Sequence, residues 1–514
     1  MIRTTAWLIP ALFMVMACHT PRGTQTRDDG KLHITLLQIN DVYEIAPLEG
    51  GKVGGMARVA TIKKEYLRKN PNTFLIMAGD FLSPSVYNGL SYEGTRIRGR
   101  QMVDAMNVAG VDFAVFGNHE FDITETELQS RLNESQFQWV ASNTFHQQAS
   151  GVAYFKKISD TGMVEFPTAT VLNLTDADGT RARIGIIGTT LPFNKASYVS
   201  YTDPLETAKR LYDSLAPVCD AVIALTHQLM EDDILLAQEL PGLALIAGGH
   251  EHDMRYQQVG PVLITKAHAN ARTLYALDLT INVKNKKRSV ASSLIAVDDQ
   301  VAIDSSTHAV VQKWIDIADQ NYSRAGFNAA EIIRTSGDPL DGREAAVRNA
   351  STNFTELITK AMAAAAPDAD LVLLNSGSIR VDDILHMPIT QFDILRSLPY
   401  GGSIREVDMK GSLLLQVLEA GNKNRGLGGF LQFYPVEYDR NSATFLFGGK
   451  PIEAERSYRV ALNDFLLSGN EVNLNFLNPQ NPAITKVYPE PKGIENPCSD
   501  VRLAIVQYLK ASER

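Results

Sequence analysis

Cysteine is scarce in this sequence, and its cysteines stand far apart. The 514 residues include 3 cysteines, Cys18, Cys219 and Cys498. A structural zinc finger needs clustered thiolates, so this class of site is excluded. An exported protein could join Cys219 to Cys498, but the sequence does not give their separation in space.

An excess of positive charge is also lacking. The chain carries 49 Lys and Arg against 58 Asp and Glu, a formal net charge of −9. Binding of a polynucleotide normally needs a basic face, so DNA and RNA are not expected as partners. Local charge or a metal ion can still capture a small anion. With 45% hydrophobic and 21% charged residues, a chain of this length is expected to form two or three globular domains.

The apolar run near the N-terminus is too short to span a membrane. It covers residues 6–16, follows Arg3 and leads into Ala17-Cys18, which is the pattern of a secretory signal. Small or aliphatic residues before a cysteine resemble a bacterial lipobox, which implies cleavage before Cys18 and a lipid on its sulfur. We therefore expect a signal over residues 1–17, a tether over 18–30, and an exported lipoprotein of the periplasm or outer membrane whose lipid is its only membrane anchor. The alternative is a plain signal peptide with an incidental cysteine.

Short apolar runs that end in polar residues recur through the first half of the chain. They cover residues 32–39, 74–78, 113–116, 221–225 and 243–247, and they lead respectively into Asn40-Asp41, Gly79-Asp80, Gly117-Asn118-His119, Thr226-His227 and Gly248-Gly249-His250-Glu251-His252. Such runs are typical of strands buried on both faces. Helical patterns over residues 56–66 and 204–215 lie between them. The alternation predicts α/β layers with a largely parallel central sheet, whose strands present their polar groups at one edge.

The polar groups at these strand ends have the chemistry of a metal site. Carboxylate, amide and imidazole ligands suit Mn²⁺, Zn²⁺, Co²⁺ or Fe²⁺. Two such ions about 4 Å apart need one bridging carboxylate and separate ligands on each side. A lone Asp or His in a loop is usually structural, but the repetition at equivalent strand ends favours a site.

The order Gly117-Asn118-His119-Glu120 resembles the signature of the calcineurin-like metallophosphoesterases. Its extension to Phe121-Asp122 resembles the 5′-nucleotidase branch of that superfamily. The resemblance implies a four-layer αββα catalytic domain over residues 31–307 and an α/β substrate-binding domain over 330–514. A linker helix over 308–329 would join them.

The same resemblance implies a role for each polar residue. It implies that Asp80 bridges two metal ions, that Asp41 and His252 hold one of them, and that the other is held by Asn118, His227 and His250. His119, oriented by Asp122, would stabilise the transition-state charge or protonate the leaving oxygen.

Tyr43 departs from the family pattern, which usually has histidine at this place. A phenol is a poor ligand unless a strongly polarising ion such as Fe³⁺ removes its proton. The other interpretation is that Tyr43 points away, so that Asp41, Asp80, His252 and water remain around a weaker site. We favour the second, because imidazole and phenol differ in length.

The second half of the chain has its own motifs. A strand is expected over residues 273–281, followed by an irregular polar segment over 282–307, a helical stripe over 310–318 and a further helix over 354–364. An apolar run at 371–374 ends at Asn375-Ser376-Gly377-Ser378-Ile379-Arg380, which resembles the Asn-Gly-Gly-x-Ile-Arg motif of the 5′-nucleotidase C-terminal domain. Residues 428–432 and 463–466 resemble its substrate-binding loops.

By this resemblance, the C-terminal domain binds a nucleotide. Phosphate or ribose would contact Arg348, Asn375 and Arg380, and the base would lie between Phe430 and Phe465, since stacking orients a planar ring. Glu471 stands where the family has an aspartate, so selectivity for base or ribose is expected to differ.

The expected activity is hydrolysis of nucleoside 5′-monophosphates to nucleoside and phosphate. The alternatives are a 2′,3′-cyclic nucleotide phosphodiesterase, a UDP-sugar hydrolase, or a nucleotide-binding lipoprotein without turnover. The pair His119 and Asp122 weighs against the last, because a binder has no need of a general acid.

Overall fold

The computed structural model describes residues 28–512. The expected signal peptide, most of the tether and the lipidation site Cys18 lie outside this range and stay predictions. Within it, no helix combines the length and apolarity that a membrane crossing requires. Cys219 and Cys498 are both buried and free, so they do not pair.

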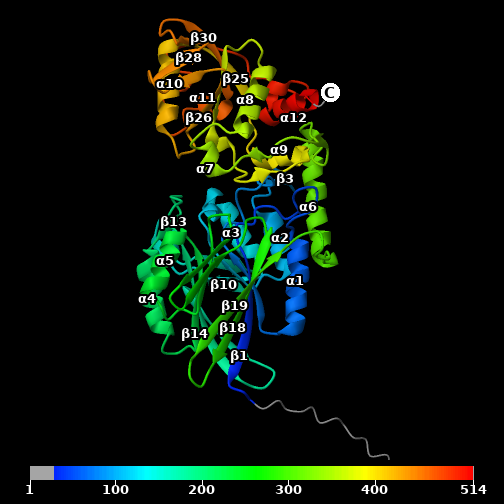
Figure 1. Cartoon of the computed structure of the whole chain (residues 1–514), viewed down its shortest axis with the longest axis vertical. Helices are drawn as coiled ribbons and strands as arrows, with labels where there is room; N and C mark the ends of the chain where they lie inside the picture. Colours follow the sequence, from blue (N-terminus) through cyan, green and yellow to red (C-terminus); the bar gives the residue numbers. More distant parts are fainter. Residues whose placement is uncertain (1–27, 513–514) are drawn as a thin grey trace, which may run out of the picture.

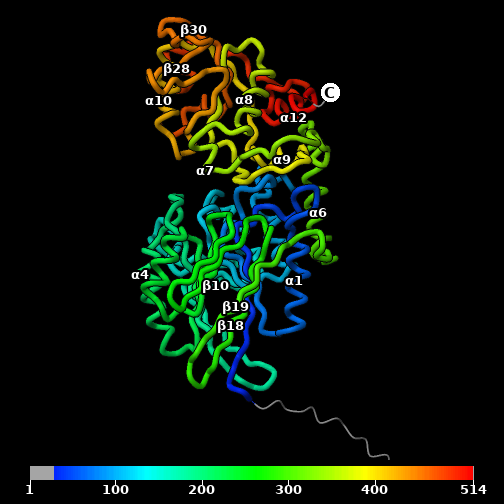
Figure 2. The backbone as a smooth tube through the Cα atoms, in the orientation of Figure 1, coloured from blue at the N-terminus to red at the C-terminus, as the bar shows by residue number. Residues whose placement is uncertain are grey.

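Two lobes are stacked along the long axis of the molecule (Figure 1). The N-terminal lobe runs from blue to green and the C-terminal lobe from yellow to red. Figure 2 traces the backbone between them along helix α6 (Ser305–Arg324). The buried side chains of Val311, Trp314 and Ala318 form the helical stripe that the sequence shows.

The N-terminal lobe is built on two six-stranded sheets. The first has the order β19 (Arg288–Ala296), β18 (Thr273–Asn282), β1 (Lys31–Ile39), β2 (Thr73–Ala78), β5 (Phe113–Val115) and β6 (Gln138–Trp139). The second has the order β11 (Ala169–Thr175), β12 (Arg181–Thr190), β14 (Ala221–His227), β15 (Leu245–Gly249), β17 (Val262–Lys266) and β16 (Arg255–Val259). Strands β1, β2, β5 and β6 are parallel, as are β12, β14, β15 and β17. Antiparallel pairing adds β18 and β19 at one edge of the first sheet, and β11 and β16 at the two edges of the second.

Apolar side chains fill the space between the two sheets. Leu36 and Ile76 from the first sheet join Ile184 and Ile223 from the second in one buried cluster. Helices α1 (Met56–Lys69), α2 (Arg100–Ala109) and α3 (Glu125–Glu134) cover the outer face of the first sheet, and α4 (Pro204–Leu215) and α5 (Met230–Glu239) cover the second. The lobe is therefore the expected four-layer αββα sandwich.

Two expectations from the pattern alone are wrong. The strands do not form one central sheet, because β1, β2 and β5 belong to one sheet while β14 and β15 belong to the other. The segment 282–307 is not wholly irregular, since β19 pairs along β18. Its polar composition reflects its place at the edge of the sheet, where most of its side chains are exposed or half-buried.

The C-terminal lobe contains a five-stranded sheet between helices. Its order is β26 (Leu431–Tyr434), β22 (Leu371–Asn375), β30 (Ser457–Asn463), β25 (Ile404–Lys410) and β31 (Ile484–Val487). Helices α8 (Asn353–Ala365) and α12 (Val501–Ser512) pack on one face and α10 (Gly411–Lys423) on the other. Helices α7 (Glu344–Val347) and α9 (Gln391–Ser397) lie on the side of the N-terminal lobe.

Short elements complete the chain. They are β3 (Ser91–Tyr92), β4 (Thr95–Arg96), η1 (His119–Asp122), β7 (Thr144–Gln148), β8 (Gly151–Ala153), β9 (Lys156–Ser159), β10 (Gly162–Glu165), β13 (Val199–Tyr201), β20 (Ile332–Arg334), β21 (Leu340–Asp341), η2 (Ser376–Ser378), β23 (Ile384–Leu385), β24 (Ile389–Thr390), β27 (Glu437–Asp439), β28 (Thr444–Phe447), β29 (Lys450–Pro451), α11 (Asp464–Leu467) and η3 (Pro497–Ser499).

Candidate active site

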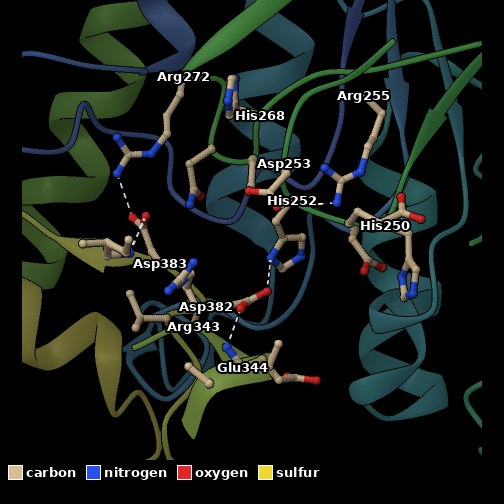
Figure 3. Close-up of a pocket in the computed structure, with 18 of the residues that line it drawn as sticks. His250, His252, Asp253, Arg255, His268, Arg272, Arg343, Glu344, Asp382 and Asp383 are labelled. Atoms are coloured by element: carbon tan, nitrogen blue, oxygen red, sulfur yellow. Dashed lines mark hydrogen bonds and ion pairs between the residues drawn. The ribbon is translucent and has the colours of Figure 1, made fainter. Parts of the chain in front are cut away.

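The polar strand ends of both sheets meet where the N-terminal lobe faces the C-terminal lobe. A cavity of about 1080 Å³ lies there. Its lining includes Asp80, His119, His250 and His252 from the N-terminal lobe and, from the C-terminal lobe, Arg343, Arg348 and Asp382. Figure 3 shows how side chains from both lobes approach one another in it. The cavity therefore spans the boundary between the lobes.

Unusual backbone turns aim the two central carboxylates into the site. Asp41 and Asp80 follow β1 and β2 with φ of 53° and 55°, in the left-handed region that residues other than glycine rarely adopt. Beside them, Gly117 permits a close approach that no side chain could, because a Cβ there would lie 2.1 Å from Oδ1 of Asp80. The glycine is thus required for the position of this carboxylate.

In both Asp41 and Asp80, one carboxylate oxygen accepts hydrogen bonds from the neighbouring loops and the other faces the histidines of the site. Oδ2 of Asp41 accepts hydrogen bonds from the Asn40 side chain (2.7 Å) and the His250 backbone N–H (2.9 Å). Oδ1 of Asp80 accepts from the His119 backbone N–H (2.7 Å). The remaining oxygens approach histidines, with Oδ2 of Asp80 lying 3.1 Å from Nε2 of His227.

Glu120, to which the sequence assigned no role, fixes the loops that carry these groups. Its buried carboxylate accepts hydrogen bonds from the backbone N–H groups of Gly117 (2.6 Å), Asp80 (2.9 Å) and Phe81 (2.7 Å). It therefore ties the end of β5 to the end of β2. Its place inside the Gly-Asn-His-Glu motif is the signal that could have identified it.

His227 shows that the site favours positive charge. Its Nδ1 lies 2.7 Å from the Ala78 carbonyl, and the tautomer that donates this hydrogen bond leaves Nε2 as an acceptor facing the Asp80 carboxylate. Two acceptors at this distance need a proton or a cation between them. Although burial alone would lower it, the Asp80 and Asp41 carboxylates raise the pKa of His227 to about 9.

These residues fit a divalent metal ion. Ligand atoms of Asp80, His227 and His250 all lie within 4.8 Å of one another. Oδ1 of Asn118 is buried without a hydrogen-bond partner, a condition that costs about 1–3 kcal/mol in an isolated acceptor. A cation would satisfy this oxygen. Asn118, His227 and His250, together with a bridging Asp80, are the ligands that the resemblance implies for one ion.

Tyr43 points into the site, so the interpretation that it turns away is wrong. Its hydroxyl lies 2.9 Å from Nε2 of His252 and 3.4 Å from oxygens of both Asp41 and Asp80. The backbone N–H of Tyr43 donates to Asn270, which holds the loop so that the ring faces inward. Burial and the two carboxylates raise the pKa of Tyr43 well above its usual range, which favours the neutral phenol. Coordination by Tyr43 stays a prediction.

Replacement of Tyr43 by histidine tests what the phenol does. We expect Tyr43→His to raise the metal affinity of the site beside His252 by about tenfold, because imidazole is a neutral donor that Zn²⁺ and Co²⁺ accept readily. Metal titration would measure this. Tyr43→Phe, which removes only the hydroxyl, is the control and should bind metal much as the wild type does. A visible band in the Fe³⁺-loaded wild type that Tyr43→Phe abolishes would instead identify a phenolate ligand.

His119 lies beside these residues and is oriented by a carboxylate. Its Nδ1 is 2.6 Å from Oδ2 of Asp122, whose other oxygen accepts from the Asn194 side chain (2.8 Å). The pKa of His119 is lowered by burial and raised more strongly by Asp80 and Asp122, with a net rise. Nothing in the sequence around Asn194 signalled its part in this arrangement.

The C-terminal lobe presents two arginines toward the N-terminal lobe. Nε of Arg380 is buried without a partner, and within residues 28–512 its side chain forms no ion pair. Burial lowers the pKa of Arg380, but Tyr400, Glu344 and Asp122 raise it above the usual value, so Asp122 of the other lobe is near enough to act on it. Arg348 pairs with Glu344 at 2.6 Å and lines the cavity.

The other expected substrate residues lie at one edge of the C-terminal sheet. Asn375 donates to Glu471 (2.6 Å) and accepts from Asn463 (2.9 Å), and all three side chains are buried. Phe430 is 8% exposed beneath the Arg425 guanidinium, whereas Phe465 is 44% exposed. The structure shows no ring contact between these two phenylalanines in the part of the chain that it describes. Their contact with a base stays a prediction.

Comparison with known proteins agrees with this geometry. Residues 34–254 match the family model of the calcineurin-like phosphoesterase, and residues 331–477 match that of the 5′-nucleotidase C-terminal domain. The chain belongs to the 5′-nucleotidase family. The predicted two-domain fold is confirmed, and the protein is a metallophosphoesterase-type hydrolase.

Its relatives are distant in sequence. It is 26% identical over 504 residues to a 5′-nucleotidase from Bos taurus, covering 85% of this chain and 83% of that protein. It is 24% identical over 499 residues to the trifunctional nucleotide phosphoesterase YfkN of Bacillus subtilis, covering 86% of this chain but only 32% of that one, so it spans about a third of YfkN. A 5′-nucleotidase precursor from Thermus thermophilus shares the fold, with a TM-score of 0.65, 23% identity and coverage of 94% and 97%.

Proposed function

We propose that this protein hydrolyses nucleoside 5′-monophosphates to nucleoside and phosphate. The observation that carries the proposal is the group formed by Asp80, His227 and His250, together with Arg380 of the other lobe, whose Nε is buried without a partner and which is near enough to Asp122 to feel its charge. A phosphate group is the ligand that a metal cluster and an unpaired arginine can share. The similarity to the bovine enzyme named 5′-nucleotidase supports a nucleotide as the ester.

The residues of the N-terminal lobe would hold the ions and the reacting group. Two divalent ions, Mn²⁺, Zn²⁺, Co²⁺ or Fe²⁺, would polarise the phosphoryl oxygens and lower the pKa of the attacking water. Asp80 would be a ligand of both ions. Asn118, His227 and His250 would hold one ion, and Asp41 and His252 would hold the other.

His119 would act on the substrate itself. Because its Nδ1 is engaged by Asp122, its Nε2 is the atom left to reach the cavity. From there it would donate a hydrogen bond to a phosphoryl oxygen, or its proton to the leaving ribose oxygen. Arg380 and Arg348 would neutralise the remaining phosphate charge.

A substrate series tests the proposal. We expect phosphate release from AMP to exceed that from ribose 5-phosphate, because stacking of the base contributes about 1–3 kcal/mol. Phe465→Ala should raise KM for AMP about tenfold and leave that for ribose 5-phosphate unchanged. Its side chain is half-exposed, so the core should survive the change.

The same assay distinguishes the alternatives. The name of YfkN makes other nucleotide esters worth including. Faster turnover of 2′,3′-cyclic AMP or of UDP-glucose than of AMP would replace the proposed substrate by that ester. Binding of AMP by metal-loaded protein without turnover of any ester would favour the non-catalytic alternative.

A further inference from the structure

Two adjacent carboxylates of the C-terminal lobe reach a histidine and an arginine of the N-terminal lobe. Oδ2 of Asp382 lies 2.7 Å from Nδ1 of His252, and Oδ2 of Asp383 lies 2.7 Å from Nη2 of Arg272 (Figure 3). The neighbouring side chains thus dock on the same face of the other lobe, but only Asp382 touches a residue of the candidate metal site.

Asp382 is held firmly on its own side of the boundary. The backbone N–H of Glu344, the first residue of α7, donates to its Oδ1 at 2.5 Å. Its φ of 39° is in the left-handed region, and so is the φ of 58° at His252. Strained backbone at both partners indicates that surrounding structure fixes their positions.

The contact determines which ring nitrogen of His252 faces the site. With Nδ1 engaged by Asp382, Nε2 points to the Tyr43 hydroxyl (2.9 Å) and to Oδ1 of Asp41 (3.5 Å). Histidines that bind metals commonly donate their second ring N–H to a carboxylate, which fixes the tautomer and the ring orientation. Here the carboxylate comes from the other lobe.

We propose that Asp382 is a positioning residue that aims His252 at the metal site beside Asp41 and Tyr43, so that this site is complete only when the C-terminal lobe is docked. The inference rests on the two-metal site of the proposed function and extends it to a coupling between the lobes. By linkage, an ion bound at His252 favours the docked arrangement to the same degree as docking favours the ion.

Metal titration of the full chain tests the coupling, with Asp383 as the matched control. We expect Asp382→Ala to weaken one of the two metal sites by about 10- to 100-fold and to leave the other unchanged. Asp382→Asn keeps an oxygen that can accept a hydrogen bond from Nδ1 of His252, so it should lose less metal affinity than Asp382→Ala. Asp383→Asn removes the charge that pairs with Arg272 and Arg396 without touching His252, so any loss of affinity that it causes reports weaker docking alone and should be clearly smaller than that of Asp382→Ala.

Distances between the lobes give a second measurement. Spin labels at Met163→Cys and Glu455→Cys, both exposed and on different lobes, report the arrangement in a chain that carries Cys18→Ser, since the other native cysteines, Cys219 and Cys498, are buried. Metal should narrow the distance distribution in the otherwise wild-type protein but not in Asp382→Ala. Circular dichroism would show that each variant is folded.

The outcomes separate this inference from the proposed function. If Asp382→Ala bound two ions with wild-type affinity and showed the wild-type change in distance on adding metal, the inference would be overturned. The proposed function would not be affected. A wild-type chain that binds no divalent ion would overturn both.

Discussion

Chelation is expected to stop phosphate release, and Mn²⁺, Co²⁺ or Zn²⁺ to restore it. Without ions, the buried carboxylates of Asp41 and Asp80 would face the phosphate and repel it, and His227 beside both and His252 beside Asp41 would offset that charge only in part. Bound ions would supply several kcal/mol of charge stabilisation, and each 1.36 kcal/mol is a tenfold change in rate. We therefore expect a loss of at least about 10³-fold.

The measurement compares phosphate release and bound metal in the same samples. Treatment with chelator followed by dialysis should remove metal and activity together, and both should return with added ion. Chelator saturated with metal beforehand is the control, and it should have no effect. Undiminished activity in excess chelator, with no metal found in the protein, would rule out a metal-dependent reaction.

Much of the fold follows from local sequence because the signals that form it are local. The buried strands β2, β14 and β15 are largely continuous apolar runs, and each leads into polar residues that are unusual in a core. Helix α4 begins at Pro204, a residue that favours the first helical position, and the side chain of Asp203 just before it caps the helix.

The assignment of strands to sheets depends instead on contacts between distant segments. Strand β12 pairs with β14 in the second sheet, although β5 and β6 before it belong to the first. The sequence of an apolar strand buried on both faces does not indicate which sheet the strand joins. Only the resemblance to a known family indicated two sheets.

Some residues of the candidate site could likewise be identified from local sequence, whereas others depend on contacts between distant segments. The residues at the strand ends were identifiable because their types and places recur. Tyr43 was judged wrongly because its orientation depends on Asn270, more than two hundred residues away in sequence. Asn194 and Asp382 act through contacts that only the folded chain creates.

Loss of the His119 side chain should reduce turnover by roughly 10²- to 10⁴-fold, the range that general acid catalysis contributes, while the metal content stays near that of the wild type. The reason is geometric: the ring is engaged by Asp122, and the hydrogen bond from His119 to the Asp80 carboxylate comes from the backbone N–H. His119→Ala removes the ring and keeps that backbone contact. Steady-state kinetics with AMP and metal analysis of the same preparation would measure both quantities.

His268 provides a matched control for this variant. It lines the same cavity, but its Nδ1 lies 3.0 Å from the Thr273 hydroxyl, and within residues 28–512 it forms no hydrogen bond or ion pair with an expected metal ligand. His268→Ala should therefore keep turnover near that of the wild type. Asp122→Asn should fall between the two variants, because the amide keeps the ring in place but removes the charge that stabilises a protonated imidazole. Loss of metal in His119→Ala would mean that His119 supports the ions, and the role of acid or charge stabiliser would then have to pass to another residue.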